Sequence, residues 1–343
     1  MHTDSSNEEQ SSIIKAPAIA AVFGASAAFG ATKLSEEYGL ALFCLLPFII
    51  TTLAAFIRAR KHEFVGVREG RSDSREHLQT IKQRKSIFWD CYKSGFLSLF
   101  MTGALILVFA IDGLLCLIMA APLAFVIAIP GAVVGLRLAR FQHQRNATKA
   151  LMLLMASFPL LMAAEYRVKP EAPIHSITTT IKVNAPIHKV WKLINAYPVI
   201  TAEPEWFFRC GIGCPMAVRL EGQDVGSTRY CDFTTGTFVE PITHWEEPTL
   251  LAFDVSHSPP PMKELSIYSD LQPAHLNGYW ENKRGQFKLS EKDGVTTIEG
   301  TSWYQHHIAP DFYWHQVSDA IVRRIHLRVV THIKELAEAQ TKE

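Results

Sequence analysis

The stretch "GTSWYQHHIAPDFYW", residues 300–314, joins a predicted strand to a long predicted helix. Residues 295–308 are predicted to form the last strand, and Pro310 opens a segment whose apolar residues recur at helical spacing. The order predicts a sheet that leads directly into a long C-terminal helix. The apolar stripe of that helix consists of Trp314, Ser318, Ile321, Ile325, Val329, Ile333 and Leu336.

The residues before this stretch predict the rest of the sheet. A strand at 174–185 alternates with a period of two, and a short helix at 186–197 has a proline in its first turn. An antiparallel sheet that curls round a long helix cannot fill its own concave side, so we expect an apolar cavity between sheet and helix. Further strands are expected at 216–222, 226–234, 236–246, 249–257 and 277–294.

Three strings in this half carry a resemblance: "TTIKVNAPIHKVWKLI" (179–194), "GSTRYCDFTTGTFVEPITHWEEPTLLAFDV" (226–255) and the stretch quoted first. They resemble the SRPBCC superfamily, also called START-like or helix-grip, and its polyketide cyclase/dehydrase and lipid-transport branch. The string "DGLLCLIMAAPLAF" (112–125) is similar to the membrane part of a membrane-anchored bacterial subgroup. The resemblance implies an α+β helix-grip domain with a ligand pocket over residues 174–340. It implies no reaction, and no catalytic motif carries over to named residues.

The first half of the chain is predicted to be a multi-span α-helical membrane module. After an N-terminal tail at 1–15, long apolar runs fill most of residues 16–166, and the run at 95–139 is long enough for a hairpin of two spans. A basic cytoplasmic segment is expected at 58–94. Five spans are expected at 16–33, 38–57, 95–111, 117–137 and 148–165.

The orientation of the spans follows from the placement of Lys and Arg. Residues 58–93 hold ten of them, and 137–149 hold four more, so both segments are predicted to be cytoplasmic. Five spans then put the C-terminal domain on the extracytoplasmic side of a bacterial inner membrane. If 147–166 lies in the interface instead, four spans leave that domain in the cytoplasm, and the sequence leaves both alternatives open. Asp112 is predicted to be the polar tip of the hairpin, the alternative being a functional acid in mid-bilayer.

The charge of the second half excludes one class of partner. Residues 170–343 hold 16 Lys/Arg against 21 Asp/Glu. Nucleic-acid binding needs a basic surface, so no nucleic-acid partner is expected. A hydrophobic small molecule or lipid, and the membrane itself, are the expected partners.

The candidate ligand-binding residues come from the predicted strands and the last helix. Charged residues on central strands could fix a ligand headgroup or act as an acid or base, although for any one of them the outer face is the alternative. The aromatic residues at 303–314 are predicted to pack at the corner between strand and helix, with one or two at the cavity mouth. The candidates are Arg229, Asp232, Glu240, His244, Tyr279, Trp303, Tyr304, His306, Trp314, Ile321 and Ile325.

No metal site and no cofactor are expected. His306 and His307 are adjacent strand residues, so at most one of them faces the cavity. A metal would need two or three further ligands, and His315, His326 and His332 share no ligand spacing. Cys210 and Cys214, in the "CGIGC" loop, could form a disulfide if the domain lies outside the cytoplasm.

Three functional hypotheses remain open from the sequence. The first is a membrane-anchored binding protein for a hydrophobic small molecule or lipid. The second is a polyketide cyclase/dehydrase-like enzyme, which cavity-facing ionisable pairs with perturbed pKa values would favour. The third is a structural or regulatory membrane protein with a filled core.

Overall fold

The computed structural model describes residues 3–66, 75–140, 144–168, 171–268 and 271–342. The chain divides into two compact units, and each is described by itself. One unit comprises Met1–Pro170 and Ser266–Pro273, and the other comprises Glu171–Leu265 and Ala274–Glu343.

The first unit is helical. Among the described residues, five stretches are long and apolar enough to cross a membrane: Ile14–Leu34, Ala41–Arg60, Ser86–Val108, Leu114–Ala139 and Asn146–Val168. Its helices are α1 (Thr3–Phe29), η1 (Gly30–Leu34), η2 (Ala41–Leu45), α2 (Leu46–Gly66), α3 (Arg75–Val108), α4 (Leu114–Ala139) and α5 (Gln144–Val168). Residues 67–74, within the predicted basic segment, lie outside the described residues.

Small residues let these helices approach closely, as expected for helices that pack in lipid. A Cβ added to Gly24 would lie 2.5 Å from the Ile50 side chain. A Cβ on Gly135 of α4 would lie 2.4 Å from the main-chain oxygen of Thr52 in α2. The hydroxyl of Thr52 donates in turn to the carbonyl of Gly131, at 3.1 Å. Glycine is therefore required where α2 and α4 touch.

Two carboxylates lie at the ends of these helices. Asp112 lies in the connection between α3 and α4, where its Oδ1 accepts from the backbone N–H of Gly113 at 2.7 Å. It is the tip of the hairpin, as predicted. Glu165, near the end of α5, accepts from the N–H groups of Leu40 and Ala41 at 2.6 and 3.2 Å. The end of α5 is thus fixed to the start of the second apolar stretch.

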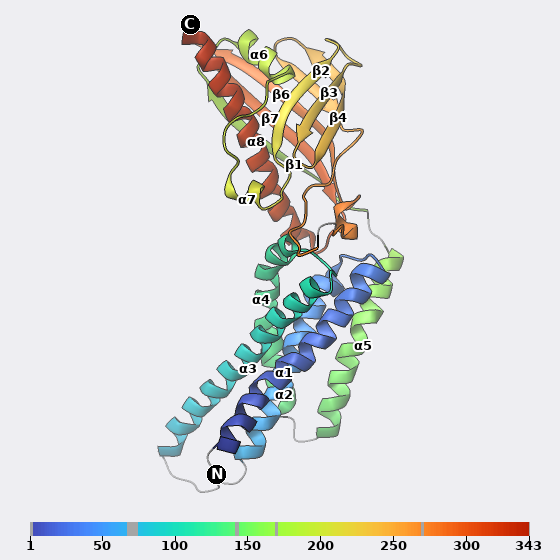
Figure 1. The fold of residues 1–343 in the computed structure, drawn as a ribbon, viewed down its shortest axis with the longest axis vertical. Coiled ribbons are helices and arrows are strands. Elements are labelled where there is room, and N and C mark those ends of the chain that lie inside the picture. Colours follow the sequence, from blue (N-terminus) through green and yellow to red (C-terminus); the bar gives the residue numbers. More distant parts are fainter. Residues whose placement is uncertain (1–2, 67–74, 141–143, 169–170, 269–270, 343) are drawn as a thin grey trace. The chain divides into compact units, whose positions relative to one another are not determined.

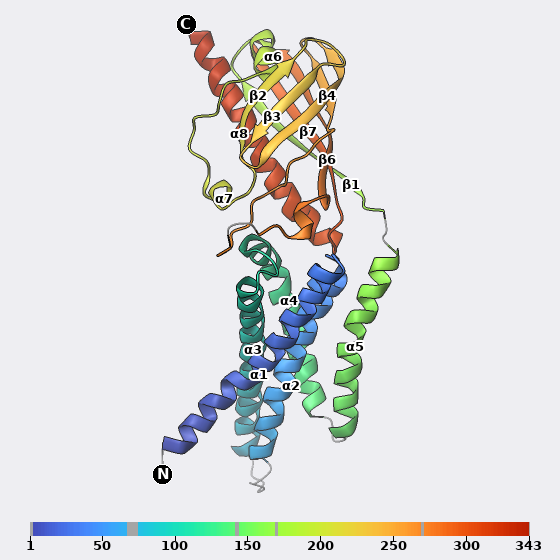
Figure 2. The same cartoon turned by 45° about the vertical axis from the view of Figure 1, so that its right-hand side comes forward.

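The second unit is a curved antiparallel sheet with a long C-terminal helix, and Figures 1 and 2 both show the sheet bending round α8. The strand order is β1-β7-β6-β5-β4-β3-β2, and each neighbouring pair is antiparallel. This architecture fits the helix-grip fold expected from the sequence. The strands are β1 (Ile174–Val183), β2 (Pro215–Glu221), β3 (Thr228–Phe233), β4 (Gly236–Glu246), β5 (Leu250–Asp254), β6 (Trp280–Lys292) and β7 (Val295–His306). The helices are α6 (Ile187–Asn195), α7 (Trp206–Arg209), η3 (Ala274–Leu276) and α8 (Asp311–Lys342).

The core of this unit lies between the sheet and the C-terminal half of α8. Val329, Val330 and Ile333 of α8 form one buried cluster with Leu251 of β5 and Ile298 of β7. The alternation of the strands explains this packing, because every second side chain points towards the helix.

The N-terminal half of α8 differs from the predicted stripe. Ile321 and Ile325 pack against a cluster that contains Phe208 and Ile212, and not between the helix and the middle of the sheet. The sheet is instead contacted one position later along the helix, where Val322 packs with Ile177 and Tyr304. A shift of one residue rotates the contact by about 100°, so the predicted stripe and the sheet-facing stripe coincide only towards the C-terminus.

Candidate functional site

A buried ion pair lies on the face of the sheet that α8 covers. Arg229 of β3 stands directly opposite Glu240 of β4, and the Nη1 atom of Arg229 donates to Oε2 of Glu240. The two side chains are only 3% and 6% exposed. The guanidinium also lies over the rings of Phe253 and Phe287, 5.1 and 5.5 Å from their centroids. Rings and carboxylate together offset the cost of burying this charge.

Further polar side chains surround the ion pair. Cys231 follows Arg229 by two residues and so shares its face of β3. Burial raises the pKa of the Cys231 thiol to about 12. Burial also raises the pKa of Tyr197 well above its ordinary value, and both groups are therefore neutral at physiological pH. The ring of Tyr197 meets that of His332 from α8, edge to face, with 5.5 Å between centroids.

The Tyr197 hydroxyl has the Cys231 thiol as its hydrogen-bond partner. Two other buried atoms of this group, Nε of Arg229 and Nε2 of His332, have none among the described residues. Buried polar atoms without partners are rare in folded proteins and need an explanation such as water or a ligand. The charges of both Arg229 and Glu240 act on the Tyr197 hydroxyl, so these groups belong to one region of the interior. We call Arg229, Glu240, Cys231, Tyr197 and His332 the interior polar group.

The carboxyl of Glu240 has a raised pKa. Burial is the main cause, and the guanidinium of Arg229 opposes it. The guanidinium stays protonated in a protein at any ordinary pH. The pair therefore holds the carboxyl in direct contact with a fixed cation, which favours its ionised form against the effect of burial.

The structure separates the charged residues predicted from the central strands. Arg229 and Glu240 come together, whereas Asp232 lies on the opposite face and accepts from the Thr237 hydroxyl at 2.7 Å. His244 is exposed, because a register shift between Ile242 and His244 changes which side chains point inward. The alternation alone could not predict that bulge.

The aromatic candidates also divide between the two faces. Tyr304 is fully buried, with its hydroxyl 2.7 Å from Oδ1 of Asp319. Trp303 points to the other face, where the guanidinium of Arg284 lies 4.4 Å from its ring centroid. Trp314 is buried in α8, and its ring lies 5.3 Å from that of Tyr313. Tyr279 is partly buried and precedes β6.

The cysteines of the "CGIGC" loop are not bonded to each other. Cys214 is buried and Cys210 is partly buried, and both are free thiols in the part of the chain that the structure describes. The disulfide considered from the sequence is not present.

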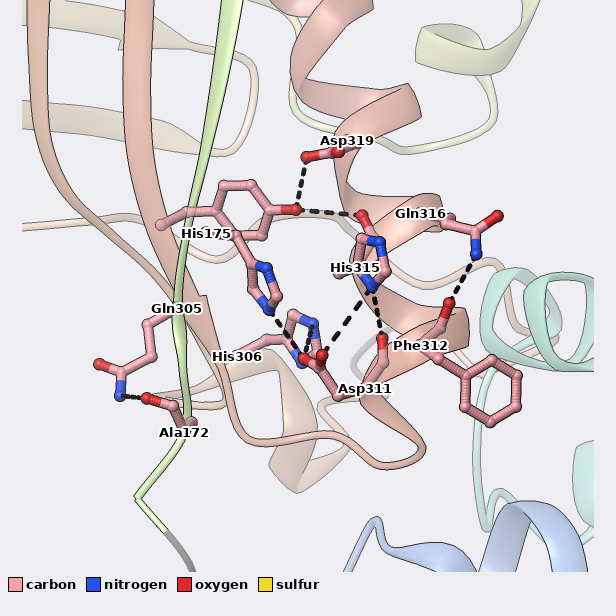
Figure 3. A network of polar contacts seen from close by, with 10 residues as sticks. Ala172, His175, Gln305, His306, Asp311, Phe312, His315, Gln316 and Asp319 are labelled. Carbon is pink, nitrogen blue, oxygen red and sulfur yellow. Dashed lines mark hydrogen bonds and ion pairs between the residues drawn. The ribbon is translucent and has the colours of Figure 1, made fainter.

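A second polar group lies where β1, β7 and the start of α8 meet. Figure 3 shows Asp311 between the imidazoles of His175, His306 and His315. Nε2 of His175 lies 2.7 Å from Oδ1 of Asp311, and Nε2 of His306 lies 3.5 Å from the same oxygen. His306 points inward and His307 is exposed, so only one of the adjacent pair faces the interior, as predicted.

Sequence reasoning missed this convergence. The sequence suggested only the helix histidines as partners for His306. The partners in the structure are His175 of β1 and Asp311 of α8. The argument that no further ligands converge on His306 was therefore wrong. The pairing of the first strand with the last one would have indicated this convergence, because it brings His175 alongside Tyr304.

Comparison with known proteins assigns the chain to no family. No protein-family model and no curated protein matches the chain. A solved structure from Nitrosospira multiformis is 15% identical and covers 49% of this chain and 100% of its own, with a TM-score of 0.33. A norcoclaurine synthase point mutant from Thalictrum flavum, solved with a transition-state analogue, is 12% identical over 51% of this chain and 99% of its own, with a TM-score of 0.32. The Aha1 dimer from Colwellia psychrerythraea is 15% identical over 48% of this chain and 96% of its own, with a TM-score of 0.29. At these values the likenesses carry no functional argument.

Proposed function

We propose that the chain is a membrane-anchored binding protein whose helix-grip domain takes up a small apolar molecule. The observation that carries this proposal is the interior polar group with its two unpartnered nitrogens, Nε of Arg229 and Nε2 of His332. They stand among the apolar side chains that line the helix-covered face of the sheet. A ligand with one polar end would place that end against Arg229, Tyr197 and His332 and its apolar remainder against the core.

The charge of the group limits the chemistry of that polar end. The positive charge of Arg229 is already matched by Glu240, and an additional buried anion would have no partner. A neutral hydrogen-bonding group, such as a carbonyl or a hydroxyl, fits better than a carboxylate or phosphate. The Nε–H of Arg229 supplies a donor to it, and the Tyr197 hydroxyl can donate or accept.

The same geometry limits which groups could act as a general base. A catalytic base needs a lone pair that is free near physiological pH. Glu240 is held by Arg229, and the Cys231 thiol, with a pKa of about 12, stays protonated. Of the interior polar group this leaves His332, whose Nε2 has no partner among the described residues, as the one candidate base of the enzyme alternative.

The Glu165 contact supports five spans over four. If α5 crosses the membrane, its end lies on the side where the second span begins, and Glu165 can cap Leu40 and Ala41. If α5 stayed in the interface next to residues 140–146, it would remain on the side where α2 ends. We therefore propose that the C-terminal domain follows a full fifth span and lies on the extracytoplasmic side.

Native mass spectrometry of the full-length protein, released from detergent, tests the binding proposal. We expect an apolar molecule to be retained by the parent chain and lost from Tyr197→Phe, which removes only the phenolic hydroxyl near Arg229 and Glu240. Tyr230→Phe is the matched control, because Tyr230 lies on the other face of β3, under Arg219. Equal retention by both variants, or no retained molecule in the parent, would contradict the proposal.

A further inference from the structure

Three side chains from three different elements offer metal ligands at one place. His175 comes from β1, His306 from β7 and Asp311 from the first residue of α8. Their ligand atoms all lie within 4.8 Å of one another. This group is distinct from the interior polar group, with which it shares no residue.

His306 is the reason to look beyond a structural role. Its side chain is 1% exposed, and Nε2, which faces Asp311, makes no hydrogen bond with any residue that the structure describes. The ring also interacts with the main chain of Ile308. A buried ring nitrogen without a partner costs free energy, because water is lost and nothing replaces it at that atom. The carboxylate of Asp311, 3.5 Å from Nε2, lies beyond hydrogen-bond distance yet within reach of a shared ion.

We propose that His175, His306 and Asp311 bind a divalent transition-metal ion of the Zn²⁺ type. Ligands about 2.0–2.1 Å from a tetrahedral ion lie about 3.3 Å from each other. The distances to Oδ1 of Asp311, 2.7 Å from His175 and 3.5 Å from His306, fall on either side of that value. Metal binding therefore requires shifts of a few tenths of an ångström at Asp311, and the ion replaces the proton between Asp311 and His175. The two imidazole nitrogens, which lie within 4.8 Å of each other, would also move to the ligand spacing of the ion.

The surroundings provide support for the ligands and an open position. Nδ1 of His315 donates to the main-chain oxygen of Asp311 at 2.9 Å, which holds the first turn of α8 in place. Outer contacts of this kind orient metal ligands in known sites. Asp311 is 45% exposed and His175 is 21% exposed, so the ion has a path from solvent and a remaining position for water. Two imidazoles with a single carboxylate suit Zn²⁺ and related ions better than Mg²⁺, which prefers oxygen ligands.

Metal binding by the full-length protein in detergent tests this site. The protein is stripped with a chelator, and Zn²⁺ affinity is measured by competition with a chromophoric chelator. Co²⁺ absorption reports the coordination geometry, and excess Mg²⁺ is the competitor that should have no effect. We expect one Zn²⁺ per chain, bound at least about tenfold more weakly by His306→Ala and by Asp311→Asn, because loss of even an outer-shell partner costs 10–100-fold.

The neighbouring histidine provides the matched control. His307→Ala removes an exposed imidazole next to His306 and should leave the Zn²⁺ affinity unchanged. Asp311→Asn keeps a side chain of the same size at the start of α8, so it tests the site even if His306→Ala fails to fold. A parent protein without stoichiometric Zn²⁺, or an affinity that both ligand variants leave unchanged, would show a purely structural His–Asp pair. Equal losses in His307→Ala and His306→Ala would show adventitious binding and also overturn the proposal.

Discussion

The contribution of the interior ion pair to stability can be tested by comparing a single variant with a double variant. Replacing Glu240 with Gln leaves the guanidinium of Arg229 buried without a counter-charge, which we expect to cost about 3–5 kcal/mol of stability. Replacing both residues, as Arg229→Met with Glu240→Leu, removes the charge as well as its partner. The double variant should therefore melt closer to the parent than the single variant does, measured by tryptophan fluorescence. A single variant as stable as the parent would mean that the pair is not buried as described.

A second residue should make stability depend on pH. Burial, with a smaller contribution from Arg323, lowers the pKa of His326 to about 4, and its ring is hydrogen-bonded to Thr179 and Ser302. The unfolded chain binds this proton at the ordinary pKa of 6.5, so the folded state is favoured by the neutral ring. That contribution is complete above pH 6.5 and is lost as the pH falls towards 4, with a slope of up to about 1.4 kcal/mol per pH unit. His326→Gln should flatten this part of the melting profile, and an unchanged slope would count against the assignment.

At the scale of elements, the contact between α2 and α4 depends on glycine. Gly135→Ala places a Cβ 2.4 Å from the Thr52 oxygen and 2.9 Å from the Ala55 side chain. Overpacking of this kind costs about 1–3 kcal/mol. Gly103→Ala in α3 is the control, because its nearest neighbour is 3.9 Å away, and it should leave the melting temperature in detergent unchanged. Equal melting temperatures for the two variants would show that α2 and α4 do not pack as described.

The elements of the fold could be predicted from the sequence, but several inward-facing residues could not. Alternation and helical spacing are local, so they identified each strand of the sheet and the long helix to within a few residues. The bulge near His244 and the one-residue offset of the sheet-facing stripe at Ile325 depend on tertiary pairing, which a single sequence does not contain. Arg229 and Glu240 were found because they lie on regular stretches of strand. His332 and Asp311 were missed because their partners, Tyr197 and His175, come from segments that are distant in the sequence.

At the scale of the whole molecule, the number of spans decides the side on which the C-terminal domain lies. In a cysteine-free background, Asn146→Cys marks the start of α5 and Glu171→Cys marks the residue after the linker, both at exposed positions. If α5 crosses the membrane, an impermeant thiol reagent added to intact cells should label Glu171→Cys and not Asn146→Cys. Labelling of both or of neither would favour α5 in the interface, and the reverse pattern would invert the orientation.

The proposed ligand places its polar end against the interior polar group, at Nε of Arg229 and Oη of Tyr197. The most direct test is an experimental structure of the purified full-length protein at a resolution that shows ordered ligands. If the binding proposal is correct, we expect continuous density, larger than a water molecule, within hydrogen-bond distance of Nε of Arg229 and Oη of Tyr197. Side chains closed over that position, or isolated waters alone, would contradict the account and leave a structural role for the domain.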